Sequence, residues 1–180
     1  FDVQGQFDLC AYLGRFMYIP QPGTLFTRAA MEAVGGWCDD VSYVADADYW
    51  IRIASRFPVV KVDRIVGRYR YHDEQRDKHR QRIARDWSRC IAAQLDAGAW
   101  LARERRFARM GVHLANYRYA APEAWGLRTL SLYKALLQNP LALLDRRFPK
   151  RELLPGRDPV WRFMSRIKRG LGFAPRGAGG

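Results

Sequence analysis

Hydrophobic residues recur along this chain mainly with the period of a helix. Apolar side chains come every three or four residues in seven segments: residues 5–16, 28–34, 45–56, 76–110, 122–137, 140–148 and 158–171. Thr27 is a suitable N-cap for the second segment, and Gly35 is a suitable stop after it. Gly98 and Gly111 are candidate interruptions of the longest segment. The pattern therefore predicts a chain in which helix predominates.

Three short segments are predicted to be strands. Residues 24–27, 59–63 and 65–71 hold β-branched and aromatic side chains and are bounded by Pro, Gly, Asp or Thr residues. In the last segment, the two-residue alternation of a strand places Arg68, Arg70 and His72 on one face. Strands mixed with helices indicate an α/β fold.

The charge of the chain is unevenly distributed. The 180 residues include 31 Lys and Arg against 18 Asp and Glu, a net charge of +13. Residues 1–75 hold 8 basic and 10 acidic residues, whereas residues 76–180 hold 23 and 8. Such asymmetry predicts two regions with different roles. We expect residues 1–75 to carry the chemistry and residues 76–180 to form a basic helical extension.

The composition excludes several classes of protein. With 48% hydrophobic and 13% aromatic residues, the chain can build a core and is not a disordered basic tail. No apolar run approaches the ~20 residues that span a bilayer. Cys10, Cys38 and Cys90 are widely spaced, which argues against a disulfide scaffold or a zinc site and fits a reducing compartment. We therefore expect a cytoplasmic protein.

The densest chemical signal runs from Tyr43 to Arg52. Asp46 and Asp48 open a predicted helix, where the helix dipole favours negative charge. Arg52 follows Asp48 by four residues, the spacing of a helical ion pair. In one interpretation the two carboxylates are ordinary first-turn helix acids. In the other, one of them projects into a cleft as a general base or a metal ligand.

A second signal lies at the end of the predicted strand 65–71. Arg68 and Arg70 suit phosphate groups through their planar guanidinium groups. His72 can bind a metal ion or change its protonation near neutral pH. The alternative is an edge strand with a polar outer face.

Four segments, in this order, resemble family 2 glycosyltransferases, which are inverting nucleotide-sugar enzymes of GT-A fold. IPQPGTLFTR (19–28) is similar to the family's Q-P-x-x-F-x-R segment, and VGGW (34–37) to its V-G-G-F. ADADYWIRIA (45–54) resembles D-x-D-L-W-x-R-x-A, and YRYH (69–72) resembles Y-R-x-H. The resemblance covers about a third of the chain, and Tyr49 replaces the usual Leu.

The resemblance implies roles for individual residues. Asp46 is the catalytic base that takes a proton from the acceptor hydroxyl. Asp48 orients the acceptor or holds the loop of the base, and Gln21 and Pro22 shape the acceptor side of the cleft. The remaining implied roles are diphosphate binding by Arg70 and His72, metal binding by His72, and packing and bracing of the helix by Trp50 and Arg52.

The resemblance also implies what lies outside these residues. The nucleotide-binding half of the family, with its Asp-x-Asp for Mg²⁺ or Mn²⁺, is expected before Phe1. The predicted fold is therefore a GT-A domain truncated at its N-terminus and inactive as 180 residues alone. Asp46 and Asp48 are not assigned as that metal motif, which normally follows a hydrophobic strand. The implied reaction transfers a sugar to a glycan or lipid-linked acceptor in cell-surface polysaccharide or glycolipid synthesis.

The alternative class is a basic helical module that binds a membrane or nucleic acid without catalysis. Residues 158–172 predict a basic amphipathic helix suited to an anionic membrane surface, which would make the protein peripheral on the inner membrane face. The same helix could instead turn its arginines to solvent. Nucleic acid is not expected as a partner, because the chain lacks zinc-finger spacing and the aromatic strand motif of RNA-binding domains.

Overall fold

The regular structure of the described residues consists of helices joined by turns and loops. The structure, a computed structural model, describes residues 7–15, 19–62, 64–68, 79–98, 100–121 and 123–144. Every described residue belongs to one compact unit, which ends at residue 148. Its elements, with η marking 3-10 helix, are α1 (Leu9–Leu13), α2 (Arg28–Val34), η1 (Asp39–Val41), α3 (Ala45–Ala54), α4 (Arg80–Asp96), α5 (Ala102–Tyr119), α6 (Trp125–Gln138) and η3 (Pro140–Leu144).

The predicted α/β fold, a truncated GT-A domain, is wrong for the described residues. The segments expected as strands contain no strand there, apart from a single bridge residue at Val60. A strand is stabilised by hydrogen bonds to a neighbouring strand and by packing of one of its faces. Leu25 and Ile65 in these segments are instead 92% and 94% exposed. The described residues of these segments are therefore extended chain and not strands; residues 63 and 69–71 lie outside the described part.

The N-cap and the stop that the sequence predicts for α2 are confirmed. The hydroxyl oxygen of Thr27 accepts a hydrogen bond from the Ala30 N–H at 3.2 Å, which caps the first turn. Gly35 follows the last residue with φ of 76°, a left-handed conformation that glycine adopts without steric cost. The helix therefore begins and ends where its sequence predicts.

The long helix predicted over residues 76–110 is two helices. Gly98, with φ of 72°, ends α4 two residues after its last helical residue, and α5 begins at Ala102. Gly111, the other candidate interruption, lies inside α5 and is buried. Gly98 therefore ends a helix, whereas Gly111 lies in the buried interior of one.

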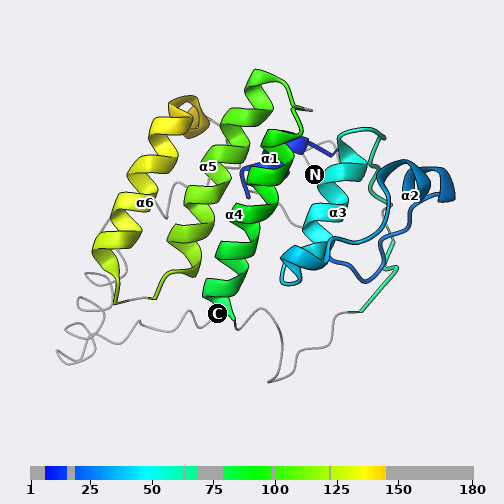
Figure 1. Cartoon of the computed structure of the whole chain (residues 1–180), viewed down its shortest axis with the longest axis horizontal. Helices are drawn as coiled ribbons and strands as arrows, with labels where there is room; N and C mark the ends of the chain where they lie inside the picture. Colours follow the sequence, from blue (N-terminus) through cyan, green and yellow to red (C-terminus); the bar gives the residue numbers. More distant parts are fainter. Residues whose placement is uncertain are drawn as a thin grey trace, which may run out of the picture. The chain divides into compact units, whose positions relative to one another are not determined.

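Three long helices form the body of the described unit. In Figure 1, α4, α5 and α6 lie side by side, with α5 packed against both of its neighbours. α1 packs against α5, and the carbonyl group of Leu13 lies directly over Gly111. The largest fully buried side chains gather on these elements and on α3: Trp87, Tyr49, Leu13, Ile51, Ile91, Met110 and Leu114.

Candidate functional site

The candidate site lies at α3, which carries both aspartates of the motif. The chain folds α2 and η1 against α3, and η1 also packs on α4. α4 belongs to the segment that was predicted as a basic extension. In the structure α4 contributes side chains to the environment of α3 and lies in the same compact unit.

Asp48 is buried at the centre of a polar network. Its Oδ2 accepts a hydrogen bond from Arg52 Nε at 2.9 Å, and Arg52 Nη2 lies 2.8 Å from the same oxygen. Its Oδ1 accepts from the Gln94 side-chain amide at 3.1 Å and from the Cys90 thiol at 3.5 Å. Both carboxylate oxygens therefore have protein partners, and the network joins α3 to α4.

Arg52 joins the same network to α2. Its guanidinium group donates to the carbonyl oxygens of Val34 and Gly36, at the C-terminal end of α2. Carbonyl groups at a helix end have no partner within the helix, and a cation there also interacts favourably with the helix dipole. Arg52 therefore bridges Asp48 and the end of α2.

An aromatic cluster covers the α2 side of α3. Trp37 stacks on Tyr49 with ring centroids 4.5 Å apart, and Phe26 lies 5.4 Å from Tyr49 and 5.9 Å from Trp50. The Arg52 guanidinium lies 5.0 Å from the centre of the Tyr49 ring, a cation–π distance. Tyr49, which departs from the family's Leu, thus occupies the centre of this cluster.

The loop before α3 is fastened to α4. Asp86 is buried, and its Oδ2 accepts a hydrogen bond from the Tyr43 N–H at 3.1 Å. Arg82 donates to the Tyr43 hydroxyl at 2.8 Å. Two residues of α4 thereby fix the backbone and the side chain of Tyr43, three positions before Asp46.

Asp46 has a different environment from Asp48. It lies in the first turn of α3, is half-buried, and accepts a hydrogen bond from the Ala47 N–H at 2.8 Å. The two carboxylates thus belong to one helical turn, but one is enclosed and the other is partly accessible. Such a difference in surroundings is what assigns two nearby carboxylates to two roles.

Gln21 and Pro22 lie in an exposed turn. Gly23, with φ of 84°, completes this turn, and the backbone of residues 22 and 23 lies against Gly67. A Cβ atom on Gly67 would lie 2.9 Å from the carbonyl carbon of Pro22, so only glycine permits this approach. The first motif segment is thereby brought beside the chain that leads to the fourth.

The residues predicted to bind diphosphate and metal lie outside the described part of the chain. These are Arg70 and His72, and the predicted membrane segment 158–172 also lies outside it. Among the described residues, no group of three His, Cys, Asp or Glu side chains could hold a metal ion. Asp48 does not suit a metal, because its oxygens are already bound by Arg52, Gln94 and Cys90.

Three residues of this site were not identified from the sequence. Asp86, Cys90 and Gln94 follow one another at four-residue intervals on α4, next to the apolar row Ile83, Trp87 and Ile91. Polar side chains on a helical face that is otherwise buried need partners elsewhere in the fold. That spacing is the signal in the sequence, although it does not name Asp48 and Tyr43 as the partners.

We expect Cys90 to be unreactive in the folded protein. Burial raises the pKa of its thiol, and the negative charge of Asp48 raises this pKa further. Because the thiolate is the reactive form, iodoacetamide should modify Cys90 about a hundredfold more slowly than the partly exposed Cys38. Mass spectrometry of peptides after timed labelling measures both rates, with a denatured sample as the control. Equal rates in the folded protein would contradict the burial of Cys90.

No protein-family model, curated protein or solved structure matches this chain. The resemblance of its four motif segments to family 2 glycosyltransferases therefore stays a prediction. Within the described residues, the helices are all too short or too polar to cross a membrane.

Proposed function

We propose that this protein transfers a sugar from a nucleotide-sugar donor to an acceptor hydroxyl with inversion, and that Asp46 is its general base. The observation that carries the proposal is the contrast between two carboxylates in one turn of α3. Asp48 is enclosed by Arg52, Gln94 and Cys90. Asp46 is half-buried, and it lies in a helical turn that the contacts of Asp48 connect to α2 and to α4. The motif resemblance supports the same assignment.

The reaction requires a base because an acceptor hydroxyl is a weak nucleophile. As the acceptor oxygen forms its bond to the anomeric carbon, the bond from that carbon to the diphosphate breaks. The electron pair of the broken bond leaves with the diphosphate, and the acceptor proton passes to a carboxylate oxygen of Asp46. Attack from the face opposite the leaving group inverts the anomeric centre.

Asp48 is proposed to position Asp46 and not to contact the acceptor. Its hydrogen bonds to Arg52 and Gln94 restrain the first turn of α3 from the α2 side and from the α4 side. A catalytic group must be held within a fraction of an ångström of its working geometry, and such second-layer contacts provide this restraint.

Other residues of the motif keep the roles that the resemblance implied. Arg70 and His72 are proposed to face the departing diphosphate, where cationic groups stabilise the growing negative charge. Gln21 and Pro22, in their exposed turn, are proposed to border the acceptor. The predicted divalent metal is assigned to none of the described residues.

Replacing Asp46 by Asn tests the proposal in the complete gene product. Asn keeps the shape of the side chain but cannot accept the proton, so kcat is expected to fall about 10²–10⁴-fold. Donor affinity should not change, because the base acts on the acceptor. Transfer is measured by mass spectrometry of products from a panel of UDP-, GDP- and dTDP-sugars, and donor binding is measured by calorimetry.

Asp40→Asn is the matched control for this experiment. Asp40 is an exposed acid in η1, a few residues before Asp46, and its replacement should leave transfer unchanged. Wild-type transfer in Asp46→Asn would refute the assignment of the base. Absence of transfer by the wild-type protein with every donor would refute the function itself.

A further inference from the structure

Trp37 presents one face of its indole ring to solvent. The ring stacks on Tyr49 with centroids 4.5 Å apart and an interplanar angle of 19°. The ring of Trp50 meets it nearly at a right angle, with centroids 6.0 Å apart. Trp37 is nevertheless 44% exposed. Because Tyr49 covers one face of the indole, the exposed surface belongs to the opposite face and to the outer edge.

The orientation of this indole ring is fixed by its neighbours. Tyr49, on which the ring stacks, is 1% exposed and belongs to the core. Arg52 donates a hydrogen bond to the carbonyl oxygen of Gly36 at 2.9 Å, which holds the peptide group that leads into Trp37. A side chain that is already ordered loses little conformational freedom when it binds a ligand. Trp37 is therefore a preorganised aromatic platform.

The platform lies beside the proposed base. Tyr49 and Trp50 follow Asp46 by three and four residues on α3, so both are its neighbours on the helix surface. Side chains of a helix lean toward its N-terminus, and the two rings therefore lean toward the turn that carries Asp46. Trp37 contacts both of these rings. The platform and the half-buried carboxylate of Asp46 thus belong to the same side of α3.

We propose that Trp37 binds the acceptor by stacking on one face of a sugar ring, so that the acceptor hydroxyl belongs to a saccharide. The C–H groups on one face of a sugar ring form an apolar surface with partial positive charge, whereas the face of an aromatic ring is negative. The hydroxyl groups around the rim of the sugar stay available, and one of them gives its proton to Asp46. This inference rests on the proposed function and names the acceptor of the same site.

The combination of an aromatic face with a nearby carboxylate favours a sugar over a purely apolar ligand. A molecule that covers Trp37 and reaches Asp46 must offer apolar surface to the first and a hydrogen-bonding group to the second. A sugar ring does both, through its C–H face and its hydroxyl groups. An apolar chain in the same place would remove water from the carboxylate without replacing its hydrogen bonds, which costs free energy.

Replacing Trp37 by Ala tests the proposal in the complete gene product. The probes are the methyl glycosides of glucose, galactose, mannose and N-acetylglucosamine, and saturation-transfer difference NMR measures their affinity. We expect Trp37→Ala to weaken the binding of each probe that binds by about tenfold, because the stacking contact is lost. In transfer to that sugar, the acceptor KM should rise about tenfold and kcat should change less than about twofold, the reverse of the effect of Asp46→Asn.

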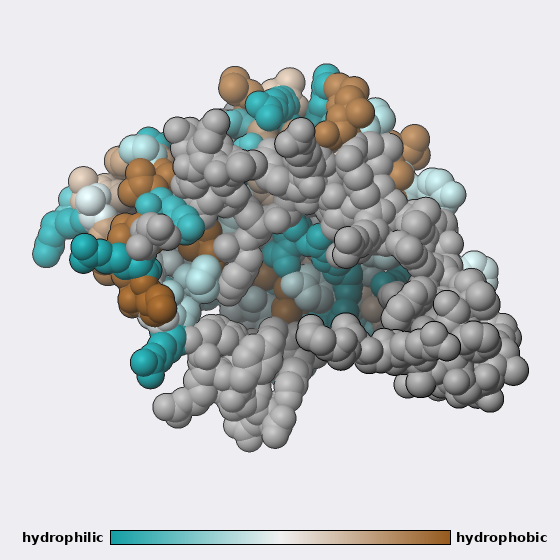
Figure 2. All heavy atoms as spheres, turned by 180° about the vertical axis from the view of Figure 1, so that it is seen from behind, coloured by the Kyte–Doolittle hydropathy of each residue, from teal (hydrophilic) through white to brown (hydrophobic). Residues whose placement is uncertain are grey.

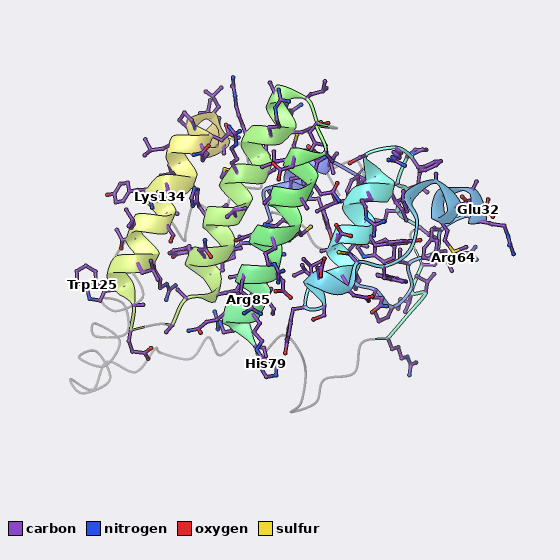
Figure 3. The ribbon with its side chains drawn as sticks, viewed as in Figure 1. Glu32, Arg64, His79, Arg85, Trp125 and Lys134 are labelled. Carbon is purple, nitrogen blue, oxygen red and sulfur yellow. The ribbon has the colours of Figure 1, made fainter. Side chains whose placement is uncertain are left out.

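Three further variants separate stacking from folding. Trp37→Tyr keeps an aromatic face and should retain binding to within about threefold. Trp37→Leu keeps apolar volume against Tyr49 but has no ring, and it should lose binding as Trp37→Ala does. Trp125→Ala is the matched control, because Trp125 is 72% exposed and lies on α6, at the opposite end of the described unit from α2 and α3 (Figure 3). Its replacement should leave the binding of every probe unchanged.

Two results would overturn the role of Trp37. One is equal probe affinity in the wild type, Trp37→Ala and Trp37→Leu, and the other is a wild-type protein that binds none of the four probes. Either result leaves the proposed function intact if transfer to another acceptor is lost in Asp46→Asn. A protein that transfers no sugar but binds a probe through Trp37 would instead refute the proposed function and retain the sugar-binding platform.

Discussion

Replacing Asp48 by Ala is expected to destabilise the protein by about 3 kcal/mol, a large part of the 5–15 kcal/mol that keeps a typical domain folded. The substitution leaves the positive charge of Arg52, whose side chain is 19% exposed, without its carboxylate. It also removes the acceptor of the Gln94 amide and of the Cys90 thiol. Buried donors that lose their acceptor cost more than the net energy of the hydrogen bond itself.

The cost should lie at the lower end of the range for broken buried ion pairs. Arg52 keeps the carbonyl oxygens of Val34 and Gly36 as partners, so its charge is not wholly uncompensated. Equilibrium unfolding in urea measures the change in the free energy of unfolding. A double-mutant cycle with Arg52→Ala isolates the energy of the pair, which should be clearly greater than zero.

Asp96→Ala is the control for the loss of a carboxylate. Asp96 is exposed at the end of α4, and its replacement should change the free energy of unfolding by at most about 0.5 kcal/mol. If Asp48→Ala were no more destabilising than Asp96→Ala, the network that joins α2, α3 and α4 would not exist in solution.

Replacing Gly111 by Ala is expected to destabilise the protein by about 1–3 kcal/mol, although alanine favours helix over glycine by about 1 kcal/mol. A Cβ atom on residue 111 would lie 1.9 Å from the carbonyl oxygen of Leu13 and 3.0 Å from its carbonyl carbon. The obstacle is backbone and cannot rotate away, so α1 must move off α5. Leu13 and Met110, both fully buried, would then lose packing.

Gly126→Ala, at a second glycine inside a helix, is expected to change the stability of the protein in the opposite direction. A Cβ atom on residue 126 would meet nothing within 4 Å. This substitution should therefore stabilise the protein by about 0.5–1 kcal/mol, because alanine loses less conformational freedom in a helix. Thermal unfolding compares the two variants, and their melting temperatures should move in opposite directions from the wild type. A rise in both would show that α1 does not pack closely on α5.

Exposed apolar side chains occur in several parts of the described unit. In the view of Figure 2, hydrophobic side chains reach the surface on the side of the molecule that carries α2. Leu25, Phe26 and Met31 are among the exposed residues there. On α6 and η3, Leu130, Leu137 and Leu144 are exposed as well.

Much of the helical structure was predictable because its causes are local. Thr27 and Gly35 define α2 through contacts within a few residues of themselves, and Gly98 ends α4 through its own backbone conformation. The pairing of Asp48 with Arg52 was also predictable, since both lie on one turn-spaced row of α3. Each of these features needs only the neighbouring sequence.

Strands and buried polar partners were not predictable in the same way. The β-branched residues Val59, Val60 and Val62 favour extended backbone, but a sheet needs a second strand, and the described residues provide none. Gly111 has the same local sequence signal as Gly98. Only the passage of α1 over α5 makes Gly111 a packing residue instead of a helix stop.

Sequence alone was enough for the order of the helices, both ends of α2, the concentration of positive charge after residue 75, and the motif that brings Asp46 and Asp48 into one turn. The tertiary structure decided which carboxylate is enclosed. Asp48 is buried because Cys90 and Gln94, more than forty residues later, supply its partners, and Asp86 on the same helix holds Tyr43. Contacts between distant residues depend on how helices pack against one another. The spacing of residues within one helix does not say which residue of another helix each side chain will contact.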